Sequence, residues 1–285
     1  MPNTDHDLAA DTFDAYKPAE MAKRVEGAGV AKAGLPLIPT FTLAILAGGF
    51  IAFGGMFYTL AVTGSDLGFG PTRVLGGAVF SLGLILVVVG GAELFTGNNL
   101  IVMAWASGKV TPAALLRNWV LVYAGNMVGS LGAVVLVALS GMFALGGGDL
   151  GVTALKIAAG KTQIPFMEAL VRGILCNTLV CLAVWLAFAA HTVPGKVMAV
   201  IFPVTAFVAL GFEHSVANMY LIPAGFVAAF DPATVAASGL SQAALDSLTP
   251  AGFIANLIPV TIGNILGGSV LVAAVYWICY LRPAK

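Results

Sequence analysis

Apolar residues form six long runs along this chain, and short polar stretches separate them. The runs cover residues 36–63, 73–105, 113–143, 165–190, 197–229 and 252–281. Each run is longer than the roughly 20 apolar residues that a helix needs to cross a bilayer. The pattern therefore predicts an all-α integral membrane fold with six transmembrane helices.

A polar stretch interrupts two of these runs, the second and the fifth, which are too long for one simple helix. The second contains GGAELFTGNN and the fifth contains GFEHSVANM, so Glu93, Glu213 and His214 lie in apolar surroundings. A charge at the bilayer centre costs at least about 2.5 kcal/mol. Irregular backbone at that depth is tolerated only where it is buried in protein or lines a cavity. Both helices are therefore expected to be broken at these stretches.

The two interruptions share a pattern. G-x-E-x-x-x-x-N begins at Gly91 and again 120 positions later at Gly211, so Asn98 and Asn218 correspond. Downstream, GNMVGS (125–130) resembles GNILGGS (263–269) at an offset of 138 positions, and a longer loop around residues 230–250 is expected to account for the larger offset. Because three crossings is an odd number, the second copy enters the membrane from the opposite side. The sequence therefore predicts an inverted 3+3 repeat, whose broken helices meet near the midplane and build a site there.

The polar segment 1–34 precedes the transmembrane domain, which is expected to cover residues 35–285. Within this segment PAEMAKRVEGAGVAKAG begins with Pro18, and proline favours the first helical turn. Met21, Val25 and Ala28 fall on one face of the helix, which is expected to lie at the membrane surface or against the bundle.

Loop charges predict the orientation. If both termini lie on one side, that side carries Lys17, Lys23, Arg24, Lys32, Lys109, Arg117, Lys196, Arg282 and Lys285, whereas the other carries Arg73, Lys156 and Lys161. Basic residues concentrate on the cytoplasmic side of membrane proteins. Both termini are therefore expected in the cytoplasm, with the protein in the cytoplasmic (inner) membrane.

Composition supports this class and excludes others. Of the 285 residues, 59% are hydrophobic and 9% are charged, against about 25% charged in soluble domains. The net charge is zero, which gives no reason to expect nucleic acid as a partner. The cysteines lie in apolar runs and are interpreted as small core residues. No nucleotide-binding, HExxH, bis-histidine or Ser/His/Asp pattern occurs, so no enzyme, metal or cofactor is expected.

The repeat separates two roles within GFEHSVANM. Glu93 and Glu213 have equivalent positions, so they are expected to shape the broken loops by accepting freed backbone N–H groups, although a direct substrate or proton role is an alternative. His214 corresponds to Leu94 and breaks the symmetry, which favours a functional role. The alternative for His214 is a buried histidine bonded to a backbone carbonyl. Thr96 and Asn177 offer polar groups nearby, or could form helix–helix hydrogen bonds.

At these residues the chain resembles a known family. AELFTGNN (92–99), GNMVGS (125–130), LCNTLVCLAVW (175–185) and ALGFEHSVANMYLIP (209–223) resemble the formate/nitrite transporter family, in particular its formate channel branch. The resemblance runs from Ala19 to Arg282. It implies an aquaporin-like protomer, a homopentamer in the lipid bilayer with one pore per protomer, and passage of small monovalent anions such as formate, nitrite or hydrosulfide.

The resemblance also implies site residues. His214, Thr96 and Asn177 correspond to the family's pore histidine, threonine and asparagine. Its apolar constrictions correspond to Phe80 and Leu84 on one side and Phe207 on the other, and Lys161 to a lysine that biases the field toward anions. On pattern alone, these Phe and Leu residues would be core or lipid-facing positions.

The resulting hypothesis explains how the anion of a weak acid could cross an apolar barrier. An apolar constriction opposes a bare anion, and protonation removes most of that cost. His214 and Thr96 would engage formate between the constrictions, and Glu213 would tune the pKa of His214. Formate would cross as the acid or paired with a proton. The alternatives are a water or neutral-solute channel with a structural histidine, and a non-transporting anchor for a formate-metabolising complex.

Overall fold

The computed structural model describes residues 14–283, and within this range the chain folds entirely into helices and connecting loops, without a β-strand. The all-α membrane fold is therefore confirmed. The second apolar run is broken at residues 91–96, between a helix that ends at Gly90 and two short helices that follow from Gly97. The fifth is broken at residues 210–214, between two helices. Residues 1–13 of the predicted N-terminal segment lie outside the described residues.

Each half of the chain contains a similar series of helices. The first half comprises α2 (Pro18–Gly34), α3 (Leu37–Val62), α4 (Phe69–Gly90), the 3₁₀ helix η1 (Gly97–Ile101), α5 (Val102–Ala106) and α6 (Pro112–Leu139). The second half comprises η2 (Met142–Gly148), α7 (Asp149–Thr162), α8 (Phe166–Ala187), α9 (Val193–Ala209), α10 (Ser215–Ala228), α11 (Pro232–Ser238), α12 (Gln242–Asp246), α13 (Pro250–Ile265), the π-helix η3 (Leu266–Ala274) and α14 (Val275–Tyr280).

Six described segments have the length and composition to cross a membrane: α3, α4, α6, η2–α7, α8 and the continuous α13–η3–α14. The fifth run is not among these six segments, because α9 and α10 are each too short to cross a membrane as a single helix. However, α7 occupies in the second half the place that α2 occupies in the first, as the contacts described below show. We therefore assign the fifth crossing to α9 and α10.

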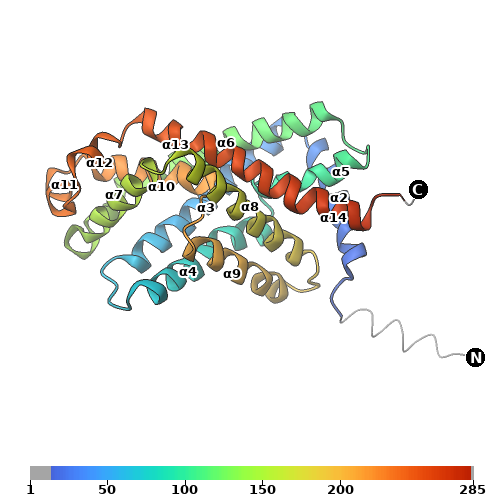
Figure 1. The fold of residues 1–285 in the computed structure, drawn as a ribbon, viewed down its shortest axis with the longest axis horizontal. Helices are drawn as coiled ribbons and strands as arrows, with labels where there is room; N and C mark the ends of the chain where they lie inside the picture. The colour runs from blue at the N-terminus through green and yellow to red at the C-terminus, as the bar shows by residue number, and fades with distance from the viewer. Residues whose placement is uncertain (1–13, 284–285) are drawn as a thin grey trace, which may run out of the picture.

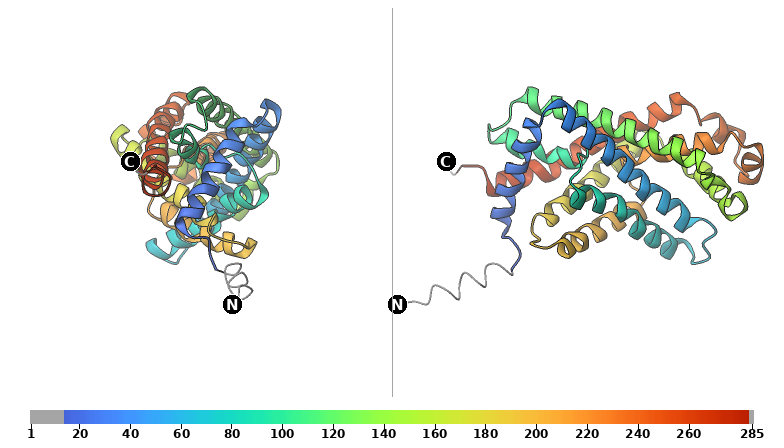
Figure 2. Two further views of the ribbon diagram at one scale, coloured as in Figure 1. Left: turned by 90° about the vertical axis from the view of Figure 1, so that its right-hand side faces the viewer. Right: turned by 180° about the vertical axis from the view of Figure 1, so that it is seen from behind.

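The long helices run between two ends of the molecule. Both described termini, with α2 and α14, lie at one end, and α7, α11 and α12 lie at the opposite end (Figure 1). The view from behind shows the same arrangement, with α4 and α9 side by side below the remaining helices (Figure 2). We call the two ends the α2 end and the α7 end.

Equivalent residues start and pack equivalent helices. Thr111 and Thr249 each accept a hydrogen bond from a backbone N–H of the first turn of α6 and α13, and each is followed by proline. This is a favourable N-terminal sequence for a helix. Gly129 of α6 lies against the backbone of Ile45, and Gly267 of η3 lies against the backbone of Ile174. A side chain at either glycine would separate the helices, so both halves depend on the same close approach.

Three details differ from the sequence expectations. The segment expected to be a loop at residues 230–250 contains the helices α11 and α12. On α2, Met21 and Val25 are buried as expected, but Ala28 is only partly buried and the charged Glu26 is buried. Cys279 is exposed, so its interpretation as a core residue is wrong, whereas Cys176 and Cys181 are buried.

Candidate functional site

The two helix breaks have the same backbone course. Gly91 follows α4 with φ +80°, and Gly211 follows α9 with φ +74°. This left-handed conformation ends many helices and favours glycine, which has no Cβ. Two residues later, the Glu93 amide donates to the Leu43 carbonyl at 3.2 Å, and the Glu213 amide donates to the Arg172 carbonyl at 3.3 Å. The breaks are therefore held against α3 and α8 in the same way.

Each buried glutamate lies between a lysine and an asparagine. In the first break, Lys32 Nζ is 2.6 Å from Glu93 Oε1, and Asn98 Nδ2 donates to Glu93 Oε2 at 2.7 Å. Asn98 Nδ2 also donates to Asn118, whose own amide donates to the Lys32 carbonyl. These contacts satisfy a carboxylate that would otherwise be costly at this depth.

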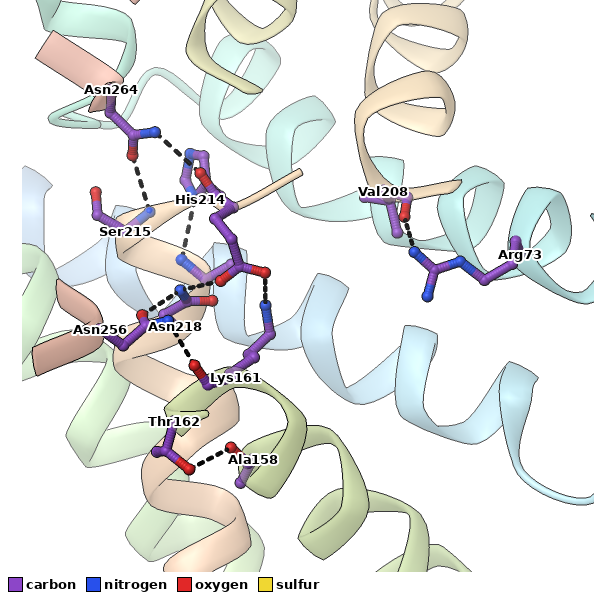
Figure 3. Close-up of polar contacts among 12 residues, drawn as sticks. Arg73, Ala158, Lys161, Thr162, Val208, His214, Ser215, Asn218, Asn256 and Asn264 are labelled. Carbon is purple, nitrogen blue, oxygen red and sulfur yellow. Dashed lines mark hydrogen bonds and ion pairs between the residues drawn. The ribbon is translucent and has the colours of Figure 1, made fainter. Parts of the chain in front are cut away.

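The second break repeats every one of these contacts. Lys161 Nζ is 2.8 Å from Glu213 Oε1, and Asn218 Nδ2 donates to Glu213 Oε2 at 2.7 Å (Figure 3). Asn218 Nδ2 also donates to Asn256, whose amide donates to the Lys161 carbonyl. Lys161 on α7 therefore corresponds to Lys32 on α2, which identifies α7 as the counterpart of α2.

A second pair of asparagines binds the freed backbone. Asn126 on α6 accepts from the Phe95 amide at 2.9 Å and donates to the carbonyls of Ala44 and Glu93. Asn264 on α13 accepts from the Ser215 amide at 2.9 Å and donates to the carbonyls of Gly173 and Glu213. Each asparagine thus fastens one broken loop to two spanning helices.

We refer to these residues as the first polar cluster (Lys32, Glu93, Asn98, Asn118 and Asn126) and the second polar cluster (Lys161, Glu213, Asn218, Asn256 and Asn264). The sequence predicted that the glutamates accept backbone N–H groups of the breaks. That prediction is wrong about the partners, because asparagine side chains take the freed N–H groups and the glutamates bind lysine and asparagine.

Five members of the two clusters were not predicted as site residues from the sequence. Asn126 and Asn264 lie in the matching GNMVGS and GNILGGS motifs, which marked the repeat without assigning them a role. Asn118 and Asn256 share the same offset of 138 positions, and Lys32 was counted only as a loop charge. Asparagines at matching positions of the repeat are the sequence signal for these residues. If they are buried, they require matching hydrogen-bond partners in both halves.

His214 and Thr96 meet where the two breaks approach each other. His214 Nε2 is 2.9 Å from Thr96 Oγ1, and both residues are buried. His214 is also the N-cap of α10, because its Nδ1 accepts from the Ala217 amide at 3.0 Å. An imidazole nitrogen that accepts a hydrogen bond carries no proton, so Nε2 carries it and donates to Thr96. The contacts therefore specify one neutral tautomer.

Aromatic rings adjoin this histidine. The ring centroids of Phe207 and His214 are 5.9 Å apart and nearly parallel. Phe80 lies edge-on to Phe207, again with 5.9 Å between centroids. These three side chains border a cavity of about 260 Å³, whose charged lining residues are Arg73, Lys156, Lys161, Arg172 and Glu213. The cavity faces the α7 end and contains four cationic side chains against one carboxylate.

A second cavity lies beside the first break, toward the α2 end. Its volume is about 210 Å³, and Lys32 is its one charged lining residue among those described. Leu84 and Leu94 belong to its lining. Phe80 and Leu84 are one helical turn apart on α4, about 6 Å along the axis. The structure thus places Phe80 with Phe207 at the α7-side cavity and Leu84 at the α2-side cavity, a grouping that differs from the expected one.

Asn177 is completely buried and lines neither cavity. Its Nδ2 lies within hydrogen-bond distance of the Thr96 carbonyl at 3.2 Å, the Asn264 carbonyl at 2.7 Å and Asn99 Oδ1 at 2.7 Å. It therefore joins the first break to α13. Lys32 and Lys161, like Leu43 and Arg172, are 129 positions apart, and at this offset the counterpart of Asn177 is Gly48 on α3. Among the described residues, this link therefore exists in one half.

These features define a class of protein: a helical membrane channel or carrier built from an inverted repeat, with two cavities separated by an apolar barrier beside a histidine. The formate/nitrite transporter family model matches residues 19–278. The chain belongs to this family, which is one of channels and transporters.

Relatives match this chain over most of its length. The chain is 47% identical over 278 residues to the formate channel FocA of Escherichia coli strain K12, covering 96% of this chain and 98% of FocA. It is 40% identical to the formate channel FocA of Haemophilus influenzae, covering 90% of this chain and 92% of that protein. A solved pentameric formate channel with formate bound superimposes with a TM-score of 0.80 at 45% identity, covering 86% of this chain and 98% of that one.

Proposed function

We propose that this protein conducts formate, and chemically similar small monovalent anions, across the cytoplasmic membrane through a pore in each protomer of a pentamer. Support comes from the 47% identity to a formate channel and from the TM-score of 0.80 with a pentameric formate channel. On this proposal the protein is not an enzyme, because it moves its substrate without changing a covalent bond. The excess of basic residues at the α2 end supports cytoplasmic termini.

One observation carries the proposal: His214, alone among the described histidines, lies in the apolar barrier, and it lines a cavity with four cationic side chains. The positive lining raises the local concentration of anions. Phe80 and Phe207 then oppose a bare charge, because an apolar constriction cannot replace the hydration shell. A weak acid passes such a barrier more easily in its neutral form, and this favours formate as a substrate.

His214 has a defined part in this scheme. In the neutral tautomer its Nε2–H donates to Thr96, and an incoming carboxylate can take the place of that acceptor. The ring can give up a proton only if Nδ1 gains one, and Nδ1 accepts from the Ala217 amide. We therefore propose that His214 first donates a hydrogen bond to the anion. It delivers its Nε2 proton only when the bond to Ala217 opens and Nδ1 takes up a proton from solvent.

The remaining residues have supporting parts in the proposal. Leu84 forms the apolar wall on the α2 side, and Lys161 contributes to the field of the α7-side cavity. Asn177 holds the Thr96 carbonyl in place. Glu93, Glu213, Asn98 and Asn218 preserve the shape of the two breaks.

The experiment is flux into proteoliposomes that contain the purified protein. Formate, nitrite and hydrosulfide are compared across pH 5 to 8, together with shrinkage under an impermeant osmolyte. We expect formate flux that increases with the gradient of the acid. Shrinkage without formate flux would instead identify a water channel, and the absence of any flux would identify a non-transporting protein.

Substitution of the histidine tests its part directly. We expect His214→Phe to lower formate flux by about 100-fold and to remove its pH dependence, because a positioned proton-transfer group typically contributes that much. Leu94→Met at the equivalent position of the first break is the matched control and should conduct like the unmodified protein. Undiminished flux of His214→Phe with the same pH dependence would rule out a central role for His214.

A further inference from the structure

The helices α4 and α9 pack along a seam that ends at the second break. Ser81 Oγ donates to the Ile201 carbonyl at 3.3 Å, and one turn earlier on α4, Gly77 lies against the backbone of Thr205. One further turn earlier, Arg73 reaches the C-terminus of α9. Contacts at intervals of four residues show that one face of α4 follows α9 in antiparallel register.

Arg73 binds two carbonyls at the point where α9 stops. Its Nε donates to the Ala209 carbonyl at 2.9 Å, and its Nη2 donates to the Val208 carbonyl at 3.0 Å (Figure 3 draws the bond to Val208). The last carbonyls of a helix lack intrahelical partners and form the negative end of its dipole. The Val208 carbonyl also accepts from the Gly211 amide at 3.1 Å, so Arg73 adds a second donor there and supplies a donor to the Ala209 carbonyl. A guanidinium makes both bonds from one planar group, which an ammonium cannot do in the same way.

This contact has no counterpart in the first repeat. The position equivalent to Arg73 is Val193 at the start of α9, and that residue is 56% exposed. Val193 cannot donate to the equivalent carbonyls of α4, which belong to Val88 and Val89. The C-terminus of α9 is therefore fastened by a side chain that the C-terminus of α4 lacks. Arg73 thus resembles His214 in two respects: it differs from its counterpart in the other repeat, and it lines the α7-side cavity.

Arg73 also lies next to the narrow part of that cavity. Val208 directly follows Phe207, and Phe80 lies two turns along α4 from Arg73. The 5.9 Å edge-on contact between these two rings thus joins the same two helices as the arginine does. The arginine and both rings line one cavity. A change in the distance between α4 and the end of α9 would therefore change the gap between the rings.

We propose that Arg73 is a positioning residue for selectivity: it holds the C-terminus of α9 against α4 and thereby fixes the opening between Phe80 and Phe207. The inference rests on the proposed function, because the opening matters only if substrate passes between these rings. A fixed narrow opening admits the smallest carboxylate and excludes its larger homologues. The charge of Arg73 also attracts anions, but that effect is shared with the other cations of the cavity.

The test is the ratio of acetate flux to formate flux in proteoliposomes. We expect Arg73→Met to raise this ratio several-fold, because the opening between the rings loosens, and Arg73→Lys to raise it less. The matched control is Lys156→Met, which removes one charge from the same cavity without touching α9. The control should lower both fluxes by a similar factor and leave the ratio unchanged.

A second measurement does not depend on flux. Hydrogen exchange at the amides of residues 210–212 should be faster in Arg73→Met than in Lys156→Met, because the helix end is released. Arg73→Lys serves for both measurements if Arg73→Met does not assemble. An unchanged flux ratio, or an exchange rate equal to that of the control, overturns the inference. Loss of formate flux in the unmodified protein would refute the proposed function instead, and the exchange measurement would still decide whether Arg73 fastens α9.

Discussion

The two helix breaks share a scaffold and differ in what lies beside it. Both contain a glycine in the left-handed region, a buried glutamate between lysine and asparagine, and an asparagine that binds the freed backbone. The first break places Leu94 where the second places His214. Shared residues thus solve the common problem of irregular backbone in a membrane, and the residues that differ determine how the pore treats its substrate.

The differences gather at the α7-side cavity. His214, Phe80, Phe207 and Arg73 all line it, and their counterparts Leu94, Val200, Val87 and Val193 are all aliphatic. The α2-side cavity has one charged lining residue among those described, and the α7-side cavity has five. An inverted repeat by itself would give a symmetric pathway. These substitutions give it one basic entrance and one apolar entrance.

Breaking an ion pair within a cluster should have the largest effect on stability. Glu213→Ala leaves Lys161 without its carboxylate, and removing one partner of a buried pair costs about 3–5 kcal/mol. Glu93→Ala should cost less, because the side chain of Lys32 is 32% exposed and that of Lys161 only 16%. Thermal unfolding of the purified protein in detergent provides the measurement.

The control for this comparison is Glu168→Ala, which removes an exposed pair with Arg172 one turn away on α8. Such pairs contribute about 0.5 kcal/mol or less. A shift in unfolding temperature for Glu213→Ala no larger than that for Glu168→Ala would show that the second cluster is not a stabilising unit.

Replacing the threonine beside His214 should have an intermediate effect, on flux rather than on stability. Thr96→Val removes the acceptor of the His214 Nε2–H, and an unsatisfied buried donor costs about 1–3 kcal/mol. We expect formate flux to decrease roughly 10-fold, which corresponds to about 1.4 kcal/mol. The control is Val216→Thr, the same exchange in reverse at the equivalent position. If both variants conduct equally, the contact between Thr96 and His214 has no part in permeation.

Acidification should have the smallest effect on stability. It should loosen α2 and leave α7 in place. Burial opposes ionisation of Glu26, but hydrogen bonds from Lys109 and Ser107 and the charge of Lys109 outweigh it and lower the pKa of Glu26. A lowered pKa stabilises the folded state above the ordinary glutamate range, and this stabilisation is lost as pH falls through the lowered value. We therefore expect α2 to remain docked above the ordinary glutamate range and to loosen as the pH falls below that range.

The equivalent position on α7 is Leu155, which is buried and does not titrate. Protection of α7 from hydrogen exchange should therefore not change over the range in which α2 loosens. Lys109→Met should loosen α2 already at neutral pH. Equal loss of protection in α2 and α7 on acidification would contradict this explanation.

Much of the site could be predicted from the sequence because its signals are local. Glu93 and Glu213 were identified because charge in an apolar run is costly, and His214 because its counterpart is Leu94. The sequence does not show in the same way that Lys32, Asn118 and Asn256 belong to the same clusters as these glutamates. Their partners lie 20 to 95 positions away. Offset matching suggests that such residues correspond, but it does not indicate what they bind.

The long apolar runs, their polar interruptions and the repeat by themselves determined the class of fold, the six crossings and the position of both breaks. These depend on bilayer thickness and on the cost of exposed backbone in lipid, which act on short stretches of chain. The tertiary structure alone decided that lysines from α2 and α7 neutralise the glutamates, that His214 is held in one tautomer, and that Arg73 fastens α9. Such contacts depend on which helices become neighbours, and that is set by packing across the whole chain.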